Sequence, residues 1–364
     1  MDTSYLEKIR ALIANIDPGL ADFSGERKRP SPPTQVSSEF LTNKEQGDWA
    51  EKTLLDGINA YSQRYIAVRY GRGDSIIAGE PSFLEFFESY QDELDTEGKR
   101  PDLLIFDRKD FPYKEADIRN WSPEELETIV TKAKCGIEVR SSAFLINKYE
   151  AFMQEKTARL LADIQRVRNM ILREPYADIL LTKNEQLYQI IQELNIDNYS
   201  VLSYRTPSWH STPQLRHLSA MLKELKGYLN GLKGRNYLSI TPKVEDLRVV
   251  CNWILRYGVP HYYVQVFFDR AYGISFEKIL SMLANPSQEG HCYSIESDIK
   301  NQGKTTIKIN AVKETNILEK IHLPNHHSQM KELDRGRLLY YVSFEESTCV
   351  LNIGGFENLF GFKL

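Results

Sequence analysis

Two acidic residues interrupt apolar runs that otherwise have the pattern of buried strands. Asp102 lies near the start of the run at residues 101–106, and Glu138 lies inside the run at residues 135–140. Burying an ionised carboxylate is costly unless it is paired with a cation or binds a metal. Two such acids on neighbouring strands could share one divalent cation, which points to hydrolysis of a phosphodiester.

The composition sets broad limits on where such a site could work. The chain has 364 residues, of which 41% are hydrophobic and 26% charged, as in an ordinary globular protein. No apolar stretch approaches the roughly 18 residues that span a bilayer. The first residues lack the basic-then-apolar order of a secretory signal, so we expect a cytoplasmic protein. The net charge of −4 excludes a uniformly basic nucleic-acid coat, but it does not exclude a local basic groove.

Hydrophobic periodicity predicts an α/β fold with a central mixed sheet and helices on both sides. The predicted core covers residues 41–280, with strands at 65–70, 101–106, 136–140 and 261–268. It includes a helical insertion at about 143–235, whose helices are expected at 143–173, 180–194 and 218–229. Residues 1–40 are expected to form a helix and a flexible arm rich in basic residues and proline. Residues 281–364 are expected to extend the same domain with strands at 305–309, 338–344 and 348–353.

The alternation of side chains along a strand suggests how the acids work. Glu138 and Arg140 point to one face of their strand, because the period of a strand is two residues. If the strands of Asp102 and Glu138 pair, both carboxylates come within reach of one cation. Mg²⁺ suits such a site, because it is commonly held by one or two carboxylates together with water and phosphate oxygens. Arg140 would then stabilise the charge that develops on the phosphate.

This arrangement resembles the PD-(D/E)XK nuclease superfamily. The matching residues are Pro101-Asp102 and Glu138-Val139-Arg140, and Glu51 matches an acid that the superfamily often carries on the preceding helix. Segments 136–144, 241–247 and 264–269 are also similar to the AccI-type family of type II restriction endonucleases. With the Glu51 helix, the resemblance spans residues 47–276.

The resemblance implies a PD-(D/E)XK core and Mg²⁺-dependent cleavage of double-stranded DNA. The implied target is the degenerate palindromic hexamer GT(A/C)(G/T)AC. A palindrome implies a two-fold homodimer, and a cognate DNA methyltransferase would be the functional partner. In this interpretation Asp102 and Glu138 bind the metal and Glu51 assists them as a further acid.

Arg140 departs from the superfamily pattern, which usually has lysine there. Arginine cannot release its proton at working pH, so it is a poor general base, although it can clamp a phosphate. We therefore expect Lys243 to supply the missing ammonium group. Two alternatives stay open: a nuclease-fold DNA-binding protein with a disabled site, and a repair or structure-specific nuclease of the same superfamily.

Candidate DNA contacts cluster in a polar and aromatic loop at 204–217 and in a Gly-rich basic connector at 226–236. Such side chains can bind phosphates or base edges, although an ordinary solvated loop has the same composition. The candidates are Arg205, Trp209, His210, Lys226, Lys233 and Arg235.

Overall fold

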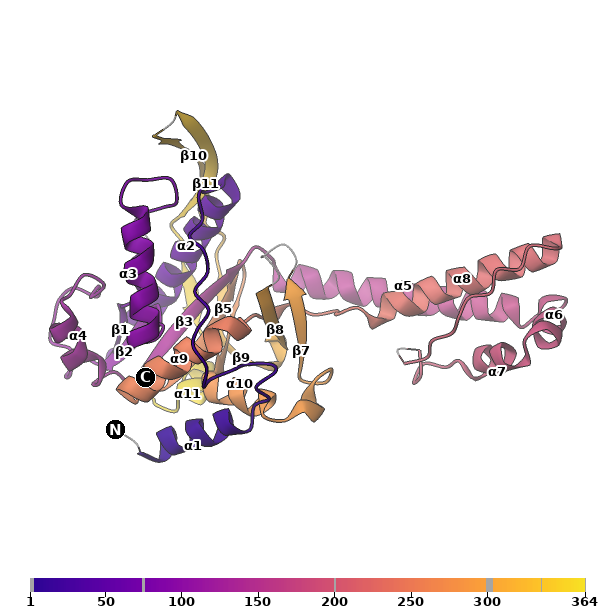
Figure 1. The fold of residues 1–364 in the computed structure, drawn as a ribbon, viewed down its shortest axis with the longest axis horizontal. Helices are drawn as coiled ribbons and strands as arrows, with labels where there is room; N and C mark the ends of the chain where they lie inside the picture. Colours follow the sequence, from indigo (N-terminus) through magenta and orange to yellow (C-terminus); the bar gives the residue numbers. More distant parts are fainter. Residues whose placement is uncertain (1–2, 74–75, 200, 299–303, 335, 364) are drawn as a thin grey trace. The chain divides into compact units, whose positions relative to one another are not determined.

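The computed structural model describes residues 3–73, 76–199, 201–298, 304–334 and 336–363. The chain forms two compact units. The larger unit combines Met1–Ile146 with Leu238–Leu364, and the smaller unit is Asn147–Tyr237. Figure 1 shows the elements of both.

A seven-stranded sheet runs through the described part of the larger unit, in the order β1-β2-β3-β5-β6-β9-β12. Strands β3 and β5 are parallel, and the other neighbours are antiparallel. The predicted α/β class with a mixed sheet is therefore confirmed. The strands are β1 (Tyr65–Arg69), β2 (Leu103–Asp107), β3 (Cys135–Ser142), β5 (His261–Phe267), β6 (Ala271–Ser275), β9 (Thr315–Ile321) and β12 (Cys349–Leu351).

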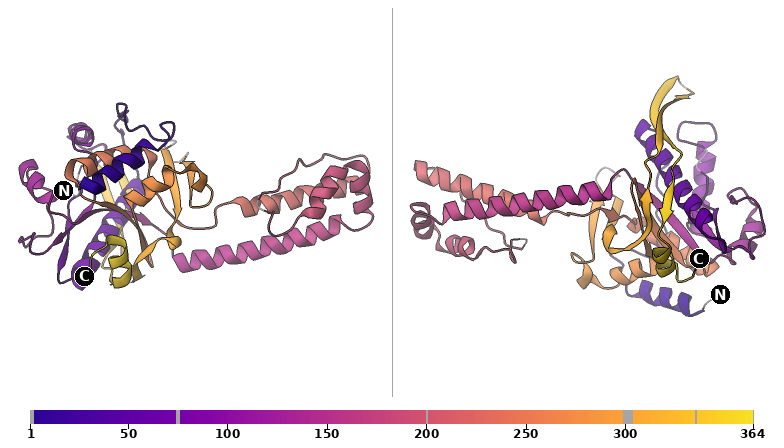
Figure 2. Two further views of the ribbon diagram at one scale, coloured as in Figure 1. Left: turned by 90° about the horizontal axis from the view of Figure 1, so that it is seen from below. Right: turned by 180° about the vertical axis from the view of Figure 1, so that it is seen from behind.

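Apolar side chains cover both faces of this sheet because successive residues of a strand point to opposite sides. Leu103 and Ile105 pack with α2 (Ser38–Tyr61) and α11 (Ile353–Phe360). Leu104 and Phe106 pack on the other face, in a second apolar cluster. Much of this cluster comes from the helices α1 (Thr3–Ala14), α4 (Pro123–Val130), α9 (Val244–Tyr257) and α10 (Phe276–Leu283). Figure 2 gives further views of these layers.

Smaller elements surround the main sheet. The strands β4 (Ser239–Ile240), β8 (Lys304–Asn310) and β7 (Tyr293–Asp298) form a second sheet, next to the short helices η1 (Pro286–Gln288) and η3 (Ala311–Lys313). A hairpin of β10 (Asn325–Leu333) and β11 (Arg337–Glu345) packs beside α2 (Figure 1). Strands expected at 305–309, 338–344 and 348–353 correspond to β8, β11 and β12, whereas β7, β9 and β10 were not predicted.

The predicted basic arm contacts α3 (Phe83–Thr96). Arg27 Nε lies 2.7 Å from Asp95 Oδ1, and Arg29 Nη2 lies 2.6 Å from Asp95 Oδ2. Asp95 therefore binds two arginines of the arm, and these contacts hold this part of the arm against the helix.

The smaller unit is helical, with α5 (Ile146–Ile171), α6 (Tyr176–Lys183), α7 (Glu185–Glu193) and α8 (Pro213–Lys233) around one apolar core. Two expectations were wrong here. The helix predicted at 180–194 is broken at Asn184, whose side chain caps α7 by accepting from the Leu187 N–H. The connector predicted from residue 226 is helical as far as Lys233, because tertiary packing outweighs the low helix propensity of glycine. Gly231 there lies against Leu160 of α5, where an added Cβ would come within 3.2 Å.

Candidate active site

The strands of the two predicted acids are neighbours. β2 and β3 pair antiparallel with Leu103 opposite Ile137, so Asp102 and Glu138 occupy the next position along the two chains. The Val139 N–H donates to Asp102 Oδ2 at 2.6 Å. Asp102 is thus tied directly to the strand that carries Glu138, and the predicted pairing of the two strands is present.

Glu138 points to the face of the sheet covered by α9, away from Ile137 and Val139, which belong to the α2 core. Its side chain is only 2% exposed. Lys99 Nζ donates to Glu138 Oε1 at 2.6 Å, and Arg140 Nη2 lies 2.7 Å from the same oxygen. Burial alone would raise the pKa of Glu138, but the charges of Lys99 and Arg140 outweigh it and hold that pKa below its usual value.

Asp246, at the start of α9, completes a cluster of four charged groups. Its Oδ2 accepts from Lys99 Nζ at 2.9 Å and from Arg140 Nη2 at 3.2 Å. Each cation therefore bridges the two acids, and the four formal charges cancel. Burial opposes ionisation of Asp246, yet Lys99 and Arg140 keep its pKa well below the ordinary range.

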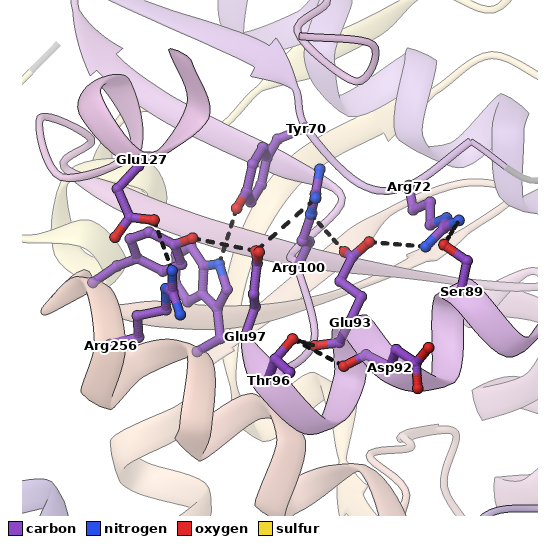
Figure 3. A network of polar contacts seen from close by, with 12 residues as sticks. Tyr70, Arg72, Ser89, Asp92, Glu93, Thr96, Glu97, Arg100, Glu127 and Arg256 are labelled. Carbon is purple, nitrogen blue, oxygen red and sulfur yellow. Dashed lines mark hydrogen bonds and ion pairs between the residues drawn. The ribbon is translucent and has the colours of Figure 1, made fainter. Parts of the chain in front are cut away.

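The chain around Lys99 is held by contacts on both sides. The Lys99 N–H donates to Val249 O of α9 at 2.8 Å. On the other side, Arg100 Nε lies 2.6 Å from Glu93 Oε1 of α3, and Arg72 Nη1 donates to Glu93 Oε2 at 2.9 Å. Figure 3 shows Arg100 reaching toward Glu93 and Glu97 on one side of α3. These contacts fix the direction in which the lysine side chain leaves the backbone.

Two glycines allow this close packing. Gly98 has a φ of +92°, and an added Cβ would lie 2.4 Å from both Trp253 N and Val249 O. Gly71 lies against Asp102, where an added Cβ would come within 3.0 Å of its Cα. Tyr70 and Gly71 donate their N–H groups to Asp102 O at 2.9 and 3.1 Å, so the backbone of the acid is also fixed.

The first acid of the predicted site, Glu51, lies on α2. Burial raises the pKa of Glu51 to about 7, and the charge of Asp48 adds to the effect, while Arg69 opposes it. Burial also raises the pKa of Asp102 above its usual value, and the charges of Glu138 and Glu51 increase the shift. Negative charge is therefore crowded around Asp102, a condition that a bound cation would relieve.

The donor set fits a magnesium ion that keeps part of its water shell. Glu138 Oε2 is buried and has no hydrogen-bond partner within the described residues. The described residues contain no group of three or more His, Cys, Asp or Glu side chains arranged to hold a metal. A Mg²⁺ ion held by Asp102 and Glu138 would therefore need water and phosphate oxygens as its remaining ligands, as is usual for Mg²⁺.

Lys243, which was expected to supply the ammonium, is the N-cap residue of α9. Burial lowers the pKa of Lys243, although the charge of Asp246 opposes the shift. Within the ranges that the structure describes, Lys243 forms no salt bridge. The interactions that sequence reasoning missed are those of Lys99 and Asp246. A signal existed, since Lys99 is three residues before Asp102 and Asp246 three residues after Lys243.

Two further polar residues of β5 face the acids and were interpreted only as part of an apolar strand. Tyr263 pairs in register with Glu138, and Gln265 with Arg140. Tyr263 Oη and Gln265 Oε1 are buried without a hydrogen-bond partner in the described part of the chain. The polar surface of the site thus extends across β5.

The predicted DNA contacts all belong to the smaller unit, whereas the acids belong to the larger one. Arg205 and His210 are exposed, and Trp209 packs against the core of the smaller unit. Lys226 and Lys233 lie on α8, and Lys233 Nζ donates to Leu202 O at 3.0 Å. The Arg235 guanidinium lies over the Tyr237 ring, 5.9 Å from its centroid.

Comparison with known proteins identifies the family. The model of the AccI restriction endonuclease family matches residues 3–363. The chain belongs to the AccI restriction endonuclease family. Members of such a family are nucleases, which makes this chain a hydrolase that binds DNA. No curated protein and no solved structure matches it. None of the helices in the described ranges is both long and apolar enough to cross a membrane.

Replacing Gly98 by alanine should loosen the Lys99 turn. The positive φ and the contacts with α9 both oppose a Cβ, so we expect a loss of at least about 2 kcal/mol in the free energy of unfolding. Urea unfolding followed by circular dichroism measures it. Gly227→Ala is the matched control, because a Cβ there meets nothing within 4 Å. Equal stability of the two variants would contradict the packing described here.

Glu51 should make stability depend on pH. Because its pKa is raised from 4.5 to about 7, the folded protein binds a proton there that the unfolded chain releases. Its contribution to stability is present at low pH and is lost as the pH rises through this window. Relative to wild type, Glu51→Gln should therefore gain stability between about pH 5 and about pH 8.

Denaturant titrations in EDTA across that range measure the difference. Glu39→Gln is the control, since Glu39 is an exposed acid of the same helix. A difference between Glu51→Gln and wild type that does not change with pH would show that the folded protein does not raise the pKa of Glu51.

Proposed function

We propose that this protein is a type II restriction endonuclease that cleaves both strands of DNA at a specific short sequence, with Mg²⁺ as cofactor. The observation that carries the proposal is the state of Glu138. One of its oxygens is held by two cations, the other is buried without a partner among the described residues, and Asp102 lies just before the neighbouring strand β2. The second carboxylate oxygen of Glu138 could therefore bind a metal cation.

Each side chain has a distinct part in the proposed reaction. Asp102 and Glu138 would hold the metal, and Glu51 would act as a further acid from α2. The bound Mg²⁺ would supply an activated water and offset charge on the phosphate. Arg140 would donate to phosphate oxygens, a role that does not require it to lose a proton.

A PD-(D/E)XK core is part of the proposal. It is supported by the pairing of β2 with β3 at the two acids, by the parallel neighbour β5, and by α2, which carries Glu51 against the sheet. Arg140 stands where the superfamily usually has lysine. Because of this departure, the alternative of a DNA-binding protein with a disabled site stays open. Cleavage therefore has to be tested directly.

The proposed target is GT(A/C)(G/T)AC, and the proposed active form is a homodimer with one site for each strand of the palindrome. The enzyme would work in the cytoplasm beside a methyltransferase that protects the same sequence. Arg205, Trp209, His210, Lys226, Lys233 and Arg235 are the proposed DNA contacts.

Incubation of unmethylated phage DNA with the protein and Mg²⁺ tests the proposal. We expect discrete fragments whose sequenced ends map to GT(A/C)(G/T)AC, and no cutting in EDTA. Glu138→Gln and Asp102→Asn should each slow cleavage at least about 100-fold, because each removes an anionic ligand that would hold Mg²⁺. Glu124→Gln, at an exposed acid of α4, is the control.

The products separate the alternatives. Binding without cutting would identify a disabled DNA-binding protein. Products that depend on junctions or ends, rather than on a sequence, would identify a repair or structure-specific nuclease. Either result would refute the proposed restriction activity.

A further inference from the structure

We propose that Lys99, rather than Lys243, supplies the ammonium group that contacts the scissile phosphate, with Asp246 as the residue that positions it. The inference rests on the proposed nuclease function and assigns a substrate contact within the same site. It is carried by the contacts, burial and backbone placement of Lys99.

The contacts of Lys99 leave one donor for a substrate. An ammonium group has three N–H donors. Two of them are taken by Glu138 Oε1 at 2.6 Å and Asp246 Oδ2 at 2.9 Å. The side chain of Lys99 is 16% exposed, so it is largely but not wholly closed off. No third acceptor for Lys99 Nζ is present among the described residues, so the remaining N–H could donate to an oxygen that enters beside Glu138.

Asp246 gives the lysine its direction. The flexible four-carbon side chain of lysine loses conformational entropy when it is held in one geometry. If other residues already hold it before the substrate binds, binding does not have to bear that entropy cost. Asp246 binds both Lys99 and Arg140 and leaves Glu138 Oε2 without a partner. The pair of cations is thus held at one oxygen of Glu138 while the other oxygen stays open to a metal.

The backbone also favours Lys99 over Lys243. Lys99 stands between the Gly98 turn, which only glycine fits, and Arg100, which is anchored to α3. It is the third residue before Asp102, on the segment that leads into β2. Lys243 lies near the same cluster, but no salt bridge joins it to Glu138 or Asp246 among the residues described. Lys99 therefore has a direct, fixed contact with the proposed metal ligand, and Lys243 has none.

Arg140 cannot fill the same role alone. Its Nη2 contacts the same oxygens of Glu138 and Asp246 as Lys99 does. The two cations thus act as a pair, and removal of either leaves two buried acids facing one positive charge. Lys99 would contribute a compact charge with a free donor, and Arg140 a planar group that can bridge two oxygens.

The test compares Lys99→Ala with Lys243→Ala, which removes the lysine first expected in this role, and with Lys132→Ala, at an exposed lysine, as the control. The first readout is the single-turnover cleavage rate on a duplex with one target site, in Mg²⁺. We expect the rate of Lys99→Ala to fall at least about 100-fold, that of Lys243→Ala to fall less, and that of Lys132→Ala to stay within about threefold of wild type. Lys99→Arg should recover part of the rate, because it restores a positive charge and donors without restoring a base.

The second readout is binding in EDTA, which does not depend on cleavage. The probes are the target duplex and the same duplex with a neutral methylphosphonate in place of the scissile phosphate. Wild type and Lys243→Ala should bind the charged duplex more tightly than the neutral one. In Lys99→Ala this preference should shrink at least about threefold, because the side chain that contacts the phosphate is gone.

Three results would overturn the inference. They are a cleavage rate of Lys99→Ala close to that of wild type, a preference of Lys99→Ala for the charged duplex equal to that of wild type, and a large loss of cleavage confined to Lys243→Ala.

If Lys99→Ala does not fold, the double variant Lys99→Met with Asp246→Asn removes one cation and one acid together. That double variant is compared with Asp246→Asn alone, and equal rates and preferences would also overturn the inference. Cleavage by wild type separates a failure of this assignment from a failure of the proposed function, since a wild type that never cuts DNA refutes both.

Discussion

A buried negative charge is the constraint on which this structure depends. Glu138 lies in a strand whose neighbours are apolar, where an unpaired carboxylate would cost several kcal/mol. Lys99 and Arg140 offset that cost at one oxygen, and Asp246 balances the second positive charge. The turn at Gly98, the anchoring of Arg100 on α3 and the start of α9 all serve to bring these groups together. Removing one partner would leave uncompensated charge in the core, so the stability of the fold depends on the cluster.

The local part of this site could be predicted from the sequence. Alternation along 136–140 correctly separated Glu138 and Arg140 from Ile137 and Val139, and acids in apolar runs identified β2 and β3. Both signals act over a few residues. The contacts of Lys99 and Asp246 could not be predicted in this way, because Lys99 is 39 positions from Glu138 and Asp246 is 147 positions from Lys99. Nothing in a local pattern states that the start of a later helix faces an earlier strand.

The errors in the helical unit have a similar origin. Gly227 and Gly231 predicted a connector, but the packing of α8 keeps these residues helical. Asn184 was included in one helix, although its side chain favours a cap, which divides the helix in two. In the C-terminal part, β9 and β10 carry polar and charged residues that hide the alternation. β9 pairs with β6 and β12, and β10 pairs with β11 in a hairpin, so strand pairing supplies what local preference lacks.

The central claim is that Asp102 and Glu138 bind one shared cation. The most direct test is a crystal structure of the protein with its target duplex and Mn²⁺, in which anomalous scattering locates the Mn²⁺ ion. The account predicts a peak within about 2–2.5 Å of one oxygen each from Asp102 and Glu138, on the side of the free Glu138 Oε2. The account would be contradicted if the carboxylates of Asp102 and Glu138 were more than about 8 Å apart. It would also be contradicted if Mn²⁺ were bound elsewhere and no metal lay between these two carboxylates.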